Sequence, residues 1–275
     1  MGKVKNVARP GLIVAYIFLI ISSFLSIFPF IWIVIGTTNT SGAIIRGKLS
    51  LGSELVNNFS KLFNDFNMST ALGNSAKIAL ITVFFSLLIC SMAGYGFQMF
   101  KSKGKEKLYG VFLVTMMVPF ASLMIPLFQL VSVLNIINSP WSVILVSSAS
   151  VFIVFFFRQS FVNYPTEILQ AARVDGASEV QIFIRVFIPS MKSTYSAAAI
   201  YIFMTSWNNY LWPLIVLQTK DQQTTTLLIS SMSSGYVPDY GVIMTGIALT
   251  TLPVVFFFFV FQKQFVKGML GSVKQ

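Results

Sequence analysis

The chain has 275 residues, of which 55% are hydrophobic and only 10% charged, with a net charge of +11 and no histidine. A soluble domain needs more charge than this to cover its surface, so the composition excludes an ordinary soluble protein and indicates a helical membrane protein. The Lys and Arg residues lie between apolar runs rather than on one soluble face, which argues against nucleic-acid binding, and the lack of His removes the commonest general base and metal ligand.

The apolar runs predict a single transmembrane domain over residues 1–275, an all-α bundle of six spans. A bilayer core of about 30 Å needs about 20 apolar residues in each spanning helix. Runs of this kind lie near residues 12–36, 74–98, 108–134, 141–161, 193–217 and 242–262. Pro119 and Pro126 in the third run and Pro253 in the sixth are expected to kink their helices. The first run resembles a signal peptide but is too long and lacks a small-residue cleavage site, so we expect a retained span.

The distribution of positive charge predicts the orientation of these spans. If the N-terminus is inside, most of the 19 Lys and Arg residues fall in segments on the cytoplasmic side, as in other membrane proteins. Both termini of this multi-pass membrane protein are then cytoplasmic. The loop between the fourth and fifth spans, residues 164–192, also faces the cytoplasm.

This loop is far more polar than the rest of the chain, and its pattern predicts two short helices joined by a turn. Pro165 and Glu167 suit the first turn of a helix, and Gly176 can take the left-handed conformation that ends it. Ser178 and Gln181 form an S-x-x-Q capping box that starts the second helix, which Pro189 stops or kinks. From spacing alone, the hairpin could lie flat under the bilayer or dock a cytoplasmic partner.

The run QAARVDGA at residues 170–177, followed by Ile188-Pro189, resembles the EAA loop of ABC importer permeases. Gln170 stands where that family usually has Glu. The resemblance implies a helix that sits in a cleft on a separate ATP-hydrolysing subunit and transmits the closure of that subunit to the spans. The residues that the resemblance assigns to this coupling loop are Glu167, Gln170, Ala171, Ala172, Asp175, Gly176, Ala177 and Pro189.

Three further segments resemble the carbohydrate branch of that family, which includes the maltose-type permeases: residues 29–41, 206–217 and 262–274. The resemblance implies a permease subunit, not an enzyme, of a binding-protein-dependent importer for a disaccharide or oligosaccharide. Its partners would be a second, unlike permease, two ATP-binding subunits and an extracytoplasmic sugar-binding protein. ATP and magnesium would bind to the ATPase partner, and this chain would bind no cofactor.

Two other patterns concern chemistry within the chain. GAIIRGKLS at residues 42–50 nearly fits a P-loop, but Leu49 replaces the magnesium-binding hydroxyl, so we interpret it as a chance match. Amides bond hydroxyl groups and aromatic rings stack on sugars, so polar and aromatic residues within spans are candidates for a sugar path. An alternative is that they hold the helices together. These candidates are Trp207, Asn208, Asn209, Tyr210 and Gln129.

Other classes of transporter stay open at this point. An importer for another polar solute, such as a polyamine, would share the coupling loop. Half of a secondary transporter, or a channel subunit, would carry ionisable residues within its spans, and these spans contain almost none away from their ends. A membrane-embedded enzyme would need a nucleophile–base or metal set, which the lack of His and the scattered acids argue against.

Overall fold

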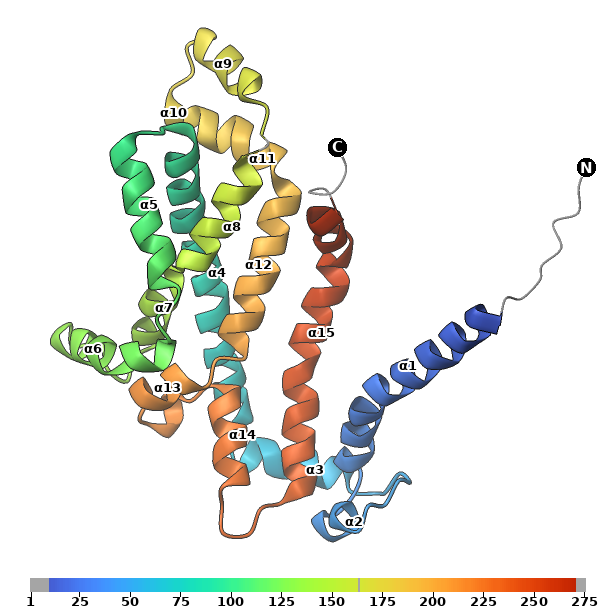
Figure 1. Cartoon of the computed structure of the whole chain (residues 1–275). Coiled ribbons are helices and arrows are strands. Elements are labelled where there is room, and N and C mark those ends of the chain that lie inside the picture. Colours follow the sequence, from blue (N-terminus) through green and yellow to red (C-terminus); the bar gives the residue numbers. More distant parts are fainter. Residues whose placement is uncertain (1–9, 163, 271–275) are drawn as a thin grey trace, which may run out of the picture. The chain divides into compact units, whose positions relative to one another are not determined.

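The computed structural model describes residues 10–162 and 164–270, and within these ranges every regular element is a helix (Figure 1). This confirms the predicted all-α class. The chain divides into two compact units, which are described separately. One comprises the described residues up to Asn67 together with Ser231–Leu249, and the other comprises Met68–Ser230 and the residues from Thr250 onward. Residues 1–9 and 271–275 lie outside the described ranges, so the predicted cytoplasmic location of the termini stays a prediction.

In the first unit, the described residues up to Asn67 form one long apolar helix and two short ones. In α1 (Pro10–Thr37), no residue of the most apolar stretch is buried within the chain, as expected for a helix whose neighbours are lipid or other subunits. The segment with α2 (Ser41–Ile45) and α3 (Leu55–Asn64) is held by the buried amide of Asn58, which donates to the carbonyls of Thr37 and Asn39 at 2.9 and 3.1 Å. Hydrogen bonds therefore order the segment that follows α1.

The second unit is built around α4 (Met68–Met99), against which α7 (Pro140–Ser148), α8 (Val151–Phe161) and α12 (Lys192–Trp207) pack. A Cβ atom on Gly94 would lie 2.9 Å from Cβ of Phe157, so glycine is required for the close approach of α4 and α8. Trp212 is fully buried and donates its indole N–H to the carbonyl of Ser142 at 2.9 Å. The core of this unit is therefore a bundle of tightly packed helices.

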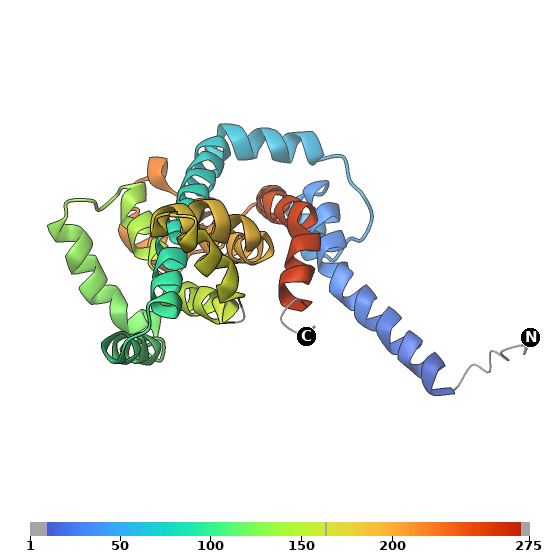
Figure 2. The same cartoon turned by 90° about the horizontal axis from the view of Figure 1, so that it is seen from above.

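The third predicted span, residues 108–134, is two helices in the structure. The axes of α5 (Lys103–Thr115) and α6 (Phe120–Val133) differ by 106°. Figure 2 shows that the two helices run in different directions. Pro119 lies at the N-cap of α6, where its missing N–H costs nothing, whereas Pro126 lies inside α6. The expected kink is thus a full bend at Pro119. The pair is either one broken span or a segment that enters and leaves on the same side.

The other spans differ less from prediction. The fifth run is also divided, because α12 ends at Trp207 and α13 (Leu211–Val216) begins after a break of three residues. The chain continues through a 3₁₀ turn (Lys220–Gln222), α14 (Thr225–Ser233) and α15 (Tyr240–Leu270), which includes Pro253. By length and composition, the described residues contain four spanning helices, or five if the bent pair counts as one. Six spans therefore remain a prediction.

Candidate functional site

The polar segment at residues 164–190, called the hairpin below, lies beyond the ends of α4 and α8 (Figure 1). Its first arm, α9 (Thr166–Val174), ends in a left-handed turn. Gly176 has φ +79, its N–H bonds to the carbonyl of Arg173, and the N–H of Ala177 bonds to the carbonyl of Ala172, both at 3.0 Å. This pair of bonds is a Schellman motif, which fixes the angle at which the chain leaves the helix.

The second arm begins with the predicted capping box. The N–H of Ser178 donates to Oε1 of Gln181 at 2.9 Å, and the N–H of Gln181 donates to Oγ of Ser178 at 3.4 Å. After one turn of α10 (Glu179–Gln181) the arm widens into a π-helix (Ile182–Phe187), in place of the regular α-helix expected from the sequence, and closes with α11 (Ile188–Ser190). Pro189 explains this difference, because it has no N–H to donate to the carbonyl four residues earlier.

The inner face of the hairpin is apolar and packs onto the ends of the bundle helices. Phe187 is fully buried, and its ring centroid lies 4.5 Å from that of Phe161 on α8 and 4.8 Å from that of Tyr95 on α4. Leu169 of the first arm is buried in the same cluster. The hairpin is therefore packed against the ends of the bundle helices rather than separate from them.

A carboxylate joins the two arms to the bundle. Glu179 accepts hydrogen bonds from Nε of Arg173 at 2.6 Å and from the hydroxyl of Tyr95 on α4 at 3.2 Å. The Arg173 guanidinium, with a smaller contribution from Tyr95, holds the pKa of the Glu179 carboxyl below its usual range, although partial burial opposes this. Glu179 therefore connects Arg173 of α9 to Tyr95 of α4, and the apolar cluster joins the same parts of the chain.

The residues predicted to form the coupling loop divide between the outer and inner faces of the hairpin. Ala172 and Ala177 are half-buried against the apolar cluster. The exposed ones are Glu167, Gln170, Ala171, Asp175, Gly176 and Pro189.

Two apolar residues lie on the outer face of α9. Ile168 and Val174 are 47% and 87% exposed, whereas their neighbour Leu169 is buried. The helix therefore buries only a narrow apolar stripe. The outer face of α9 therefore combines exposed apolar side chains with a polar rim.

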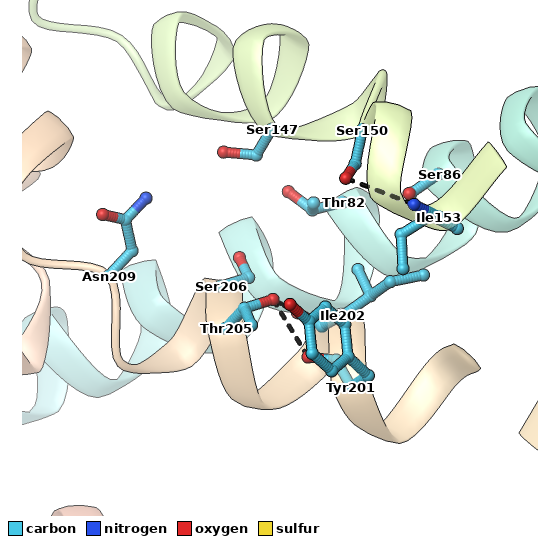
Figure 3. A pocket seen from close by; sticks show the side chains of 10 residues that line it. All are labelled: Thr82, Ser86, Ser147, Ser150, Ile153, Tyr201, Ile202, Thr205, Ser206 and Asn209. Atoms are coloured by element: carbon cyan, nitrogen blue, oxygen red, sulfur yellow. Dashed lines mark hydrogen bonds between the residues drawn. The ribbon is translucent and has the colours of Figure 1, made fainter. Parts of the chain in front are cut away.

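A second candidate site lies inside the bundle of the second unit. A cavity of about 190 Å³, called the hydroxyl pocket below, is enclosed by α4, α7, α8, α12 and the residues that follow α12 (Figure 3). Most of its lining side chains carry hydroxyl groups, and none is charged. The lining residues are Thr82, Ser86, Ser147, Ser150, Ile153, Tyr201, Ile202, Thr205, Ser206 and Asn209.

Some hydroxyls of this pocket are used within the protein and others are not. Oγ of Ser150 caps α8 by accepting from the N–H of Ile153, and Oγ1 of Thr205 donates to the carbonyl of Tyr201. Oγ1 of Thr82 and Oγ of Ser206 have no hydrogen-bond partner among the described residues. A buried hydroxyl without a partner costs about 1–3 kcal/mol. The pocket therefore contains polar groups that require a partner from outside the chain.

An apolar hollow of about 810 Å³ adjoins this pocket and shares Ser147, Ser150 and Asn209 with it. Residues of α5, α6, α7 and α8 form most of its wall, including Phe120 and Phe152. The bend between α5 and α6 is what leaves this space beside α7. A polar pocket and a larger apolar one therefore meet on the same side of the second unit.

The five predicted path residues lie in different environments. Trp207 is buried, stacks on Phe203 with ring centroids 5.5 Å apart and donates to the carbonyl of Thr250, which is the packing role named as the alternative. The hydroxyl of Tyr210 accepts from Ser230, while Asn208 and Gln129 are exposed.

Only Asn209 of the five lines the hydroxyl pocket. Sequence reasoning missed Thr82 and Ser206. The available signal was the presence of hydroxyl residues within apolar runs, which is common in membrane helices and carries no spacing pattern.

Comparisons with known proteins concern the family of the whole chain. Residues 86–271 match the family model described as "Binding-protein-dependent transport system inner membrane component". The lactose transport system permease protein of Rhizobium radiobacter is 52% identical over 95% of this chain and 96% of its own length. The arabinooligosaccharides transport system permease protein of Bacillus subtilis is 36% identical over 94% of each chain.

A solved structure shows the same fold. A chain of a bacterial ABC transporter involved in the import of the acidic polysaccharide alginate superimposes with a TM-score of 0.82 over 91% of this chain and 95% of that chain. The sequence identity is 19%, so the comparison concerns the fold alone. The helix breaks described above are thus found in a chain whose overall fold resembles that of an importer subunit.

Proposed function

We propose that this chain, which belongs to the family of binding-protein-dependent transport system inner membrane components, is the permease subunit of an ATP-driven importer for a neutral disaccharide or oligosaccharide. The observation that carries the sugar assignment is the full-length similarity to permeases named for lactose and arabinooligosaccharide transport. The hydroxyl-rich, uncharged pocket within the bundle supports it, because neutral polyols are recognised by hydroxyl and amide groups.

The hairpin is the part of the chain that receives force from ATP hydrolysis. A separate ATPase, which binds ATP and magnesium, grips the outer face of α9, where Ile168, Ala171 and Val174 are exposed beside Glu167. A rigid connection is needed for this role, because a flexible loop would absorb the movement instead of passing it on. The Schellman motif, the capping box and the Glu179 contact supply that rigidity.

The complete transporter contains this chain, a second and unlike permease, two ATP-binding subunits and an extracytoplasmic sugar-binding protein. It resides in the bacterial cytoplasmic membrane, with six spans in this chain and both termini in the cytoplasm. The excess of Lys and Arg in the segments assigned to the inside supports this orientation. The apolar surface of α1, unburied within the chain, supports contact with lipid or another subunit.

Purification and transport together test this function. The tagged chain is extracted from its native membrane in mild detergent, and the proteins that accompany it are identified by mass spectrometry. Uptake of radiolabelled lactose, maltotriose and arabinobiose is then compared between cells with and without the gene.

We expect a second permease and a Walker-type ATPase in the complex, and loss of uptake of at least one of these sugars on deletion. A chain recovered alone would contradict the importer assignment and favour a channel or half of a secondary transporter. A complete complex with unchanged sugar uptake would contradict the sugar assignment and favour another polar solute, such as a polyamine.

A further inference from the structure

We infer that the hydroxyl pocket is a sugar-binding site, in which this chain bonds hydroxyl groups of the transported solute during its passage. The inference deepens the proposed function and depends on it. It rests on two unpaired hydroxyls, those of Thr82 and Ser206, that two different helices direct into one uncharged cavity (Figure 3).

Two hydroxyl groups in the pocket have no hydrogen-bond partner among the described residues. Thr82 on α4 is 1% exposed, and neither its Oγ1 nor Oγ of Ser206 on α12 has a partner among the described residues. Figure 3 shows both side chains facing the same space as the amide of Asn209. A hydroxyl both donates and accepts one or more hydrogen bonds, and so does each hydroxyl of a sugar. Two such groups across one cavity match neighbouring hydroxyls on a sugar ring.

The lining of the hydroxyl pocket carries no charge, and this property selects among polar solutes. Among the described residues, no side chain that lines the pocket is Asp, Glu, Lys or Arg. A polyamine would need carboxylates there, and a phosphorylated solute would need Lys, Arg or clustered N–H groups. Hydroxyl groups and one amide, from Asn209, suit a neutral polyol.

The volume of the hydroxyl pocket and the hollow beside it limit the size of the solute. At about 190 Å³ the pocket is smaller than the roughly 300–1,000 Å³ that holds a drug-sized ligand, so it accommodates one sugar ring. The adjoining hollow of about 810 Å³ can hold the remainder of a longer sugar. Tyr201 lines the pocket and Phe152 lines the hollow, and their ring centroids are 4.9 Å apart. An aromatic pair at this junction offers a surface for the apolar face of a sugar ring.

The experiment removes one hydroxyl at a time from the complete transporter. Thr82→Val and Ser206→Ala are reconstituted in proteoliposomes with the partner permease, the ATPase and saturating binding protein. Initial uptake of radiolabelled lactose, maltotriose and arabinobiose is measured together with the melting temperature of the complex. We expect uptake of the transported sugar to fall about three- to tenfold, the equivalent of one lost hydrogen bond. The melting temperature should stay unchanged or rise, because each variant deletes an unpaired buried hydroxyl.

Thr245→Val is the matched control. Thr245 is fully buried, but its Oγ1 already donates to the carbonyl of Gly241 at 2.8 Å and it does not line the pocket. This variant should retain uptake and lower the melting temperature, the reverse of the pattern expected for Thr82→Val.

Deoxy analogues of the transported sugar make the test sharper. If Thr82 bonds one hydroxyl of the sugar, the wild type imports the analogue that lacks this hydroxyl more slowly than the complete sugar. Thr82→Val, which has already lost this hydrogen bond, imports the analogue and the complete sugar at the same rate. Equal losses with every analogue would contradict a direct contact.

The possible failures are separable. If the wild type imports a sugar and both pocket variants import it equally well, the inference is wrong and the proposed function stands. If uptake falls only in proportion to the assembled complex, with a lower melting temperature, the hydroxyls serve packing and the inference is again wrong. If the wild type imports none of the three sugars, the proposed function fails first.

Discussion

The hairpin and the hydroxyl pocket differ in how they are encoded. The hairpin is one contiguous segment whose turn, cap and apolar face follow from neighbouring residues such as Gly176 and Ser178. The pocket brings together hydroxyls from α4, α7, α12 and Ser150, the residue before α8, and no local motif marks any of them. The proposed coupling role requires local rigidity, whereas the proposed solute site only requires polar groups brought together by packing. Variants of the hairpin should therefore affect every solute equally, while variants of the pocket should depend on the sugar.

The largest expected effect is that of Gly176→Pro. Gly176 has φ +79, whereas proline fixes φ near −65°. The substitution would also remove the hydrogen bond from the N–H of Gly176 to the carbonyl of Arg173. If the substitution destabilises the native turn by about 3 kcal/mol, the ratio of docked to undocked hairpin falls about a hundredfold. We expect sugar uptake to be abolished for every sugar while ATP hydrolysis by the complex persists, measured as sugar imported per ATP in proteoliposomes.

Gly47→Pro is the control for this change, because Gly47 has φ +73 and lies outside the hairpin. It should lower the yield of the complex but leave the ratio of sugar to ATP intact. A normal ratio in Gly176→Pro would contradict the coupling role of the hairpin. A bulky charged residue in place of Ala172 is a less specific test than Gly176→Pro. The Ala172 side chain packs against the apolar cluster, so the substitution would disrupt the folding of the hairpin itself.

A smaller effect is expected for Val174→Asp on the outer face of α9. Val174 is 87% exposed, so the substitution leaves the hairpin folded but places a charge where the ATPase is proposed to bind. We expect the amount of ATPase recovered with the tagged chain to fall about tenfold, as for a lost contact worth about 1.4 kcal/mol. Val180→Asp, at a residue 67% exposed on the second arm, is the matched control and should retain ATPase. Equal recovery of ATPase with both variants would place the interface elsewhere.

Tyr95→Phe should reduce coupling modestly. The substitution keeps the ring in the apolar cluster and removes only the hydrogen bond to Glu179. We expect sugar imported per ATP to fall about two- to tenfold, to the same extent for each sugar. Tyr16→Phe, at an exposed position on α1, serves as the control. A loss that differs between sugars would assign Tyr95 to the solute path instead.

The smallest effect concerns pH. Because the pKa of Glu179 is lowered by Arg173, the stabilising contribution of this carboxylate is complete above its unfolded pKa of about 4.3 and is lost only as pH falls through the lower folded value. The ratio of coupling in Glu179→Gln to that in the wild type should therefore be constant between about pH 5.5 and 8. A ratio that approaches one at the acidic end would mean that Glu179 is protonated there.

The sequence predicted the parts of the molecule that depend on local chemistry. The left-handed turn at Gly176 and the capping box of Ser178 with Gln181 were both confirmed, since each involves residues within five positions of one another. The exposure of Val174 could not be predicted, because it depends on which stripe of α9 faces the apolar cluster. Pro119 predicted a kink, but a proline alone does not give its size, which is 106° between α5 and α6.

The hydroxyl pocket could not be predicted for a related reason. Thr82 and Ser206 are separated by more than a hundred residues, and each looks like an ordinary small residue of a membrane helix. Their meeting depends on the approach of α4 to α12, which the sequence does not encode as a motif. The amides and aromatic rings of residues 207–210 were more conspicuous, yet Trp207 is a packing residue and only Asn209 lines the cavity.

The ring contacts of Phe187 have a consequence for biosynthesis. Its aromatic neighbours are Tyr95, Phe161, Tyr164 and Phe183, all of which precede it along the chain. Ribosomes add about 5–20 residues per second, and the turn and cap of the hairpin involve only short-range bonds that form much faster. The ring contacts of Phe187 therefore require no residue that follows it in the chain, and α12, whose Ala198 and Ile202 belong to the same apolar cluster, joins them later.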